Sequence, residues 1–152
     1  MKEKVLQCIS AAVGAVVSFF TGLPPILLIM LIVMSLDYVS GIICGCMGKS
    51  PKTEHGGLSS GAALQGLLKK MALLAIVALA YLLDWAVTAG AGVEFAAVSS
   101  ATCLWFIASE GISIVENAAA MGVPIPEVIR RALEIMRSKG GGGSEPPEES
   151  VA

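Results

Sequence analysis

Apolar residues dominate four long stretches of the chain, and polar residues collect between them. The stretches cover residues 5–23, 24–47, 67–89 and 95–121. Each has about 19 residues or more, so at about 1.5 Å per residue each is long enough to cross a hydrocarbon core about 30 Å thick. The pattern predicts an all-α integral membrane protein with about four transmembrane helices, which together form a domain over residues 1–122.

The lysines and arginines fall into three groups, and a four-span threading puts all three groups on one side of the membrane. The connections near residues 23–25 and 89–94 contain neither Lys nor Arg. Because cytoplasmic loops are enriched in these residues, both termini are predicted to be cytoplasmic. The groups are Lys2 with Lys4, then Lys49, Lys52, Lys69 and Lys70, then Arg130, Arg131, Arg137 and Lys139. The basic residues expected to anchor this topology at the membrane surface are Lys69, Lys70, Arg130 and Arg131.

The residues after the fourth stretch predict a short amphipathic helix and then a disordered tail. Within residues 123–139, an apolar stripe that includes Ile129 and Leu133 runs beside basic residues, which is typical of a helix lying on a membrane surface. Residues 140–152 are rich in Gly and Glu and are predicted to be disordered. At the other end, residues 5–23 resemble a signal peptide, but no small-residue cleavage site follows, so we expect the segment to be retained as a helix.

Composition supports a membrane protein and argues against several other classes. Hydrophobic residues make up 55% of the chain and charged residues only 14%, well below the roughly 25% usual in soluble domains. With a net charge of −2, the chain lacks the basic balance of a nucleic-acid-binding protein. Its four cysteines form no C-x-x-C pair, and His55 has no second ligand nearby, so neither a metal nor a cofactor site is expected. We find no nucleophile–base pair and predict that the protein is not an enzyme.

Two acidic residues lie well inside apolar stretches and are the first candidate functional residues. Asp37 is near the middle of the second stretch, and Glu110 is inside the fourth. A charged side chain at the bilayer centre costs about 3 kcal/mol, and no stretch offers an obvious buried lysine or arginine to pair with it. Each acid is therefore either a protonated hydrogen-bond donor between helices, or part of a polar lumen or of a contact between subunits.

Small and polar residues form rows at helical spacing beside these acids. Such rows let helices approach closely in lipid, and the row in the fourth stretch, which also includes Phe106, is mostly small or polar. We predict that the rows face other subunits or a lumen. Their candidate residues are Asp37, Gly41, Gly45, Ser99, Cys103, Glu110, Ser113 and Asn117.

Three sequence blocks resemble a known family over about residues 26–133. The blocks are LDYVSG at 36–41, LSSG at 58–61 followed by GLLKK at 66–70, and SEGISIVEN at 109–117 leading into GVPIP at 122–126. In order and spacing the chain resembles the phage holin family that includes the clostridial toxin-secretion holins. The Gly- and Glu-rich tail departs from the compact basic end expected in that family.

The resemblance implies a holin that acts in the bacterial cytoplasmic membrane. Such a protein accumulates in the lipid bilayer, forms homo-oligomers, and at a timed point opens lesions that release a cell-wall hydrolase (an endolysin) or a toxin, without necessarily binding it. No catalytic residue is implied. Two alternatives stay open at this point: a small ion channel or transporter subunit with Asp37 in its pathway, and an antiholin-like regulator that does not permeabilise the membrane.

Overall fold

The computed structural model describes residues 2–53 and 55–140, and within these ranges the protein is entirely helical. This confirms the predicted all-α fold class. The tail predicted to be disordered covers residues 140–152; Gly140 is the last residue of the final helix, and residues 141–152 lie outside the described residues. The helices are α1 (Lys2–Thr21), α2 (Pro25–Cys46), α3 (Ser60–Ala91), α4 (Ala97–Met121) and α5 (Glu127–Gly140).

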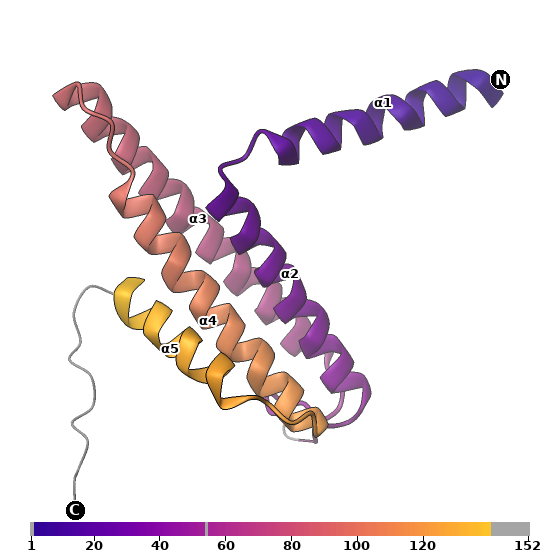
Figure 1. Ribbon diagram of the computed structural model, residues 1–152. Helices are drawn as coiled ribbons and strands as arrows, with labels where there is room; N and C mark the ends of the chain where they lie inside the picture. Colours follow the sequence, from indigo (N-terminus) through magenta and orange to yellow (C-terminus); the bar gives the residue numbers. More distant parts are fainter. Residues whose placement is uncertain (1, 54, 141–152) are drawn as a thin grey trace, which may run out of the picture.

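Three of the described helices, α2, α3 and α4, are long and apolar enough to cross a membrane. The sequence predicted four spans; the first stretch, in α1, is not one of these three, so a crossing by α1 stays a prediction. The first turn of α1 carries charged residues, and the helix points away from the rest of the molecule (Figure 1). On α1, Leu6 and Val13 are more than half exposed.

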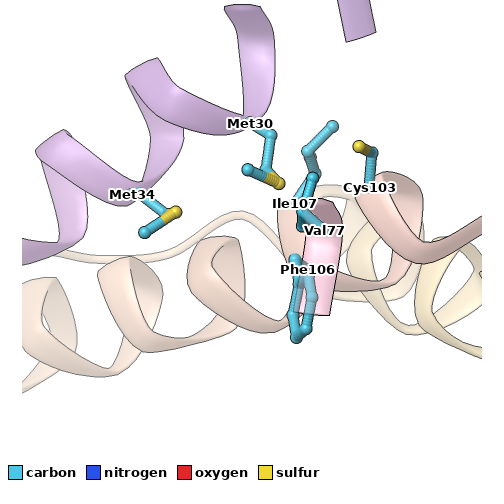
Figure 2. Packing of buried hydrophobic residues seen from close by; sticks show 6 residues of the cluster. All are labelled: Met30, Met34, Val77, Cys103, Phe106 and Ile107. Carbon is cyan, nitrogen blue, oxygen red and sulfur yellow. The ribbon is translucent and has the colours of Figure 1, made fainter. Parts of the chain in front are cut away.

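Helix α4 is the centre of the bundle and packs against α2, α3 and α5. The largest cluster of buried apolar side chains lies where α2, α3 and α4 meet (Figure 2). Two of its members are methionines, whose unbranched side chains fill irregular gaps between helices. The cluster consists of Met30, Met34, Val77, Cys103, Phe106 and Ile107.

Local signals set the helix ends. Helix α2 starts at Pro25, which suits a first helical position because its missing N–H needs no partner there. The Ser59 hydroxyl accepts a hydrogen bond from the Ala62 N–H at 3.4 Å, and this cap begins α3 before the third apolar stretch. Helices α3 and α4 end at Gly92 and Gly122, whose positive φ angles of 69° and 92° favour glycine.

The connection between α2 and α3 folds back on itself at a second pair of glycines. Gly56 has a φ of 69°, and a Cβ atom at this position would lie 2.2 Å from the carbonyl oxygen of Gly48. The backbone N–H of Ser50 donates a hydrogen bond to the Gly56 carbonyl at 2.8 Å, which closes the turn.

We therefore expect Gly56→Ala to open this loop and to destabilise the protein by more than the roughly 1–2 kcal/mol that a left-handed alanine costs. Thermal unfolding in detergent, followed by circular dichroism, measures the loss. The matched control is Gly57→Ala, because a Cβ at Gly57 meets nothing within 4 Å. Equal melting temperatures for the two variants would contradict the expected clash.

Helix α5 turns back after residues 122–126 and runs along α4 (Figure 1). Its Leu133 packs against Gly111 so closely that a Cβ there would lie 2.7 Å from Leu133 Cδ2. The Arg137 guanidinium lies 5.8 Å from the centre of the Trp105 ring, within the range of a cation–π contact. Helix α5 thus has a partner within the chain, while its predicted position on the membrane surface stays a prediction.

Candidate functional site

Three charged side chains from three different helices meet inside the bundle. Lys70 of α3 donates one hydrogen bond to Asp37 Oδ2 of α2 at 2.9 Å and another to Glu110 Oε2 of α4. The side chains of Lys70, Asp37 and Glu110 are only 12%, 8% and 10% exposed. We call these three residues the ionic cluster.

A buried amide joins the ionic cluster to a second hydrogen-bonded group. The Asn117 side chain donates to Asp37 Oδ1 at 3.3 Å and to Ser40 Oγ at 2.9 Å. The Ser40 hydroxyl in turn donates to the Asp37 carbonyl at 2.9 Å. A Cβ at Gly41 would lie 3.7 Å from Asn117 Nδ2, an ordinary van der Waals distance, so this contact does not require glycine. Every buried side-chain nitrogen or oxygen within the described ranges has a hydrogen-bond partner.

The ionic cluster lies near the middle of the spans. Asp37, Lys70 and Glu110 are about nine to eleven residues from the ends of their helices at Cys46, Ser60 and Met121. At about 1.5 Å per residue, this is about 15 Å into the bundle, or half the thickness of a hydrocarbon core of about 30 Å. Charges at this depth are costly unless they are paired.

The sequence analysis missed the partner of the two acids. Lys70 was predicted to lie at the membrane surface, and no buried base was predicted for Asp37 or Glu110. Both predictions are wrong. Helix α3 begins at Ser60, so Lys70 lies almost three turns into it and points inward, whereas Lys69 is exposed. The cap at Ser59, taken together with two unpaired acids, was the signal that could have identified Lys70.

The other predicted site residues line the interior of one chain. Within the bundle, Gly45, Ser99, Cys103 and Asn117 are buried, and Gly41 and Ser113 are partly buried. Their predicted role at a subunit contact or a lumen stays a prediction, and it requires the bundle to rearrange. Arg130 and Arg131, predicted as anchors, are exposed on α5.

The charges of the ionic cluster do not balance. Two ionised carboxylates face one ammonium group, so the cluster holds one surplus negative charge unless a carboxyl group binds a proton. A complete cluster ties α2, α3 and α4 together, whereas separating the helices leaves three charged groups that need water. Chemically the arrangement suits a latch between helices. Within the described residues, no group of side chains has the composition of a metal site.

A small cavity of about 80 Å³ reaches the ionic cluster from the connection between α2 and α3. Asp37 and Lys70 line its inner end, and Ser50, Thr53 and Ser59 contribute polar side chains from the loop. A space of this size holds only a few water molecules. It provides an approach for water or protons, but not an open pathway.

A third buried acid, Asp84, caps α4 from outside that helix. The Asp84 carboxylate of α3 accepts hydrogen bonds from the backbone N–H groups of Val98 at 3.0 Å and Ser99 at 2.8 Å. These donors lie in the first turn of α4, where N–H groups have no partner within the helix.

We expect Asp84→Ala to destabilise the protein by about 1–2 kcal/mol, because it removes a helix cap and leaves two N–H groups without their acceptor. Unfolding in detergent with increasing denaturant gives the change. The control is Glu94→Ala, at an exposed position in the turn between α3 and α4. Its stability should stay within about 0.5 kcal/mol of that of the parent. If both variants unfold alike, the cap contributes nothing.

Comparison with known proteins places these features in a family. The sequence model of the bacteriophage holin family matches residues 14–138. An uncharacterized protein of Clostridium perfringens strain 13 is 34% identical over 142 residues, covering 90% of this chain and 96% of the relative. A probable holin of Bacillus phage phi105 is 31% identical over 123 residues, covering 81% and 82%. No solved structure matches the chain.

The family match includes the three candidate spans, the ionic cluster and most of α5. It confirms the resemblance found in the sequence, and the family is not one of enzymes. The family model covers most of the chain, including its three candidate spans and the ionic cluster. This chain therefore belongs to the bacteriophage holin family.

Proposed function

We propose that this protein is a holin that assembles into homo-oligomers in the bacterial cytoplasmic membrane and opens lesions at a timed point. The lesions release a cell-wall hydrolase or a toxin from the cytoplasm. Membership of the holin family supports this function, and so does the similarity to the probable holin of phage phi105.

The structural observation that carries the proposal is the ionic cluster. Within one chain, Asp37, Lys70 and Glu110 satisfy one another and are hidden from lipid. When α2, α3 and α4 separate, the same groups become polar surface at the centre of the membrane, where only water or another subunit stabilises them. The cluster thus gives the bundle two states, a closed one compatible with lipid and an open one compatible with a water-filled lesion.

The proposed orientation follows from the basic residues. The connection with Lys49 and Lys52 lies at the same end of the bundle as the start of α5, and the outer turn between α3 and α4 contains neither Lys nor Arg. We place the connection and the C-terminus in the cytoplasm. A cytoplasmic N-terminus additionally requires α1 to cross the membrane, which labelling of an N-terminal tag from each side tests.

The test is timed expression in a bacterium that makes a cytoplasmic cell-wall hydrolase without an export signal. Culture density and membrane potential are recorded together. We expect abrupt lysis that requires both proteins, with the potential collapsing at its onset. Loss of potential without hydrolase release would favour a small channel. No change in either, although the protein is in the membrane, would favour a regulator that does not permeabilise.

A further inference from the structure

The outer surface of the bundle has two chemically different sides. The outward side chains of α2 and α3 are mostly large and apolar, as lipid requires, and examples are Ile32, Leu36, Leu79 and Leu82, each about half exposed or more. On the opposite side of α4, the outward surface belongs to α5, where charged side chains lie beside the exposed apolar side chains of Val128, Ile129 and Ile135. Its exposed charged residues are Glu127, Arg130, Arg131, Glu134, Arg137 and Lys139.

This charged side extends to membrane depth. Helix α5 follows α4 from its end at Met121 up to Trp105, which is about 16 residues or about 24 Å along a helix. The side chains of Arg131 and Glu127 are 74% and 65% exposed, and their one salt bridge is to each other at 3.3 Å. Lipid tails against this surface would leave several charges without solvation.

A groove between α4 and α5 gives the same side room for water. Its volume is about 620 Å³, and Glu116, Arg130, Glu134 and Arg137 contribute charged side chains to its wall. Apolar residues of α4, such as Ile112 and Val115, also line it. A groove of this size with this many charged groups suits water far better than acyl chains.

We propose that the charged α4–α5 side of each subunit lines the water-filled lumen of the lesion, with α2 and α3 facing lipid. This inference rests on the proposed holin function and adds to it a second lumen-lining surface, beside the groups of the ionic cluster that separation of the helices exposes. Helix α5 stays docked on α4 in the lesion, and its charges lie in the lumen. The rival arrangement has α5 detached and lying on the membrane surface, which leaves the α4 face around Trp105 against lipid.

Tryptophan fluorescence in vesicles separates the two arrangements. Trp85→Phe leaves Trp105 as the single tryptophan, half-buried at the edge of the groove beside Arg137. The matched control carries Trp85→Phe, Trp105→Phe and Leu79→Trp, which places the probe on the apolar side of α3 at similar depth. Each variant is quenched either by aqueous acrylamide or by lipids brominated on the acyl chain. Leakage of a trapped dye is measured in the same vesicles.

In leaking vesicles we expect acrylamide to quench Trp105 several times more steeply than the control tryptophan, and brominated lipid to do the reverse. Quenching of Trp105 by brominated lipid to the control level would overturn the proposal, because α4 would then face lipid. Quenching of Trp105 by neither agent would also overturn it, because a protein contact would then cover the face. Absence of leakage at any protein concentration would instead count against the holin function itself.

Discussion

Replacing Lys70 with methionine is expected to lower the stability of the bundle by about 3–5 kcal/mol, the largest loss of any single substitution considered. The methionine side chain fills similar space but leaves Asp37 and Glu110 buried with no counter-charge. Ser40 and Asn117 donate hydrogen bonds but supply no positive charge. Unfolding in detergent micelles with increasing dodecyl sulfate, followed by circular dichroism, gives the difference in free energy.

The neighbouring lysine supplies the control for this experiment. Lys69 is exposed and makes no salt bridge among the described residues, so Lys69→Met should change stability by no more than about 0.5 kcal/mol. A rescue variant that combines Lys70→Met with Asp37→Asn and Glu110→Gln should recover most of the loss, because it removes all three charges together. Equal stability of the Lys69 and Lys70 variants would show that the ionic cluster does not hold the helices together.

Replacing Asp37 with asparagine is expected to delay lysis. The substitution keeps the size of the side chain and removes the surplus negative charge, leaving Lys70 and Glu110 as a balanced pair. A balanced pair stabilises the closed bundle relative to the open one, and each 1.4 kcal/mol of such stabilisation changes the ratio of the two states about tenfold. The onset of lysis, in cultures with matched amounts of membrane-inserted protein, measures the effect.

The control for timing is Glu94→Gln, which makes the same chemical change at an exposed position in the outer turn. Its onset should match that of the parent. Onset of the Asp37→Asn variant at the parental time would mean that the carboxylate plays no part in opening. Earlier onset would mean that the Asp37 charge stabilises the closed state even though the cluster holds surplus negative charge, contrary to the delay expected from a balanced pair.

The sequence predicted the helices better than it predicted their partners. Period and length alone located α2 and α4 within a few residues, because long apolar runs leave little choice of structure. The stripe through Cys103, Glu110 and Asn117 lies on the buried face of α4, although it was predicted to face other subunits or a lumen, because the pattern does not say whether a polar face meets the same chain or another. Only the packing of three helices shows that these side chains are buried within one bundle.

The partners of Lys70 and the membrane crossing of α1 could not be predicted reliably from the local sequence pattern. Lys70 is separated by 33 and 40 residues from its two partners, and nothing in the local pattern links positions so far apart. The prediction that α1 crosses the membrane relied on its apolar length, and the candidate spans found among the described residues are α2, α3 and α4. Whether a marginal helix inserts depends on neighbours that a single chain in isolation does not supply.

The length of α3 has a practical consequence for the outer surface. Its 32 residues extend about 48 Å, whereas the 22 residues of α2 extend about 33 Å. Because a hydrocarbon core is about 30 Å thick, α3 tilts or carries its last turns into the aqueous layer. In Figure 1, α3 and α4 continue well past the start of α2. In the orientation proposed above, the turn between them lies on the outer side of the membrane, and a short epitope inserted there is expected to be accessible to an antibody outside the cell.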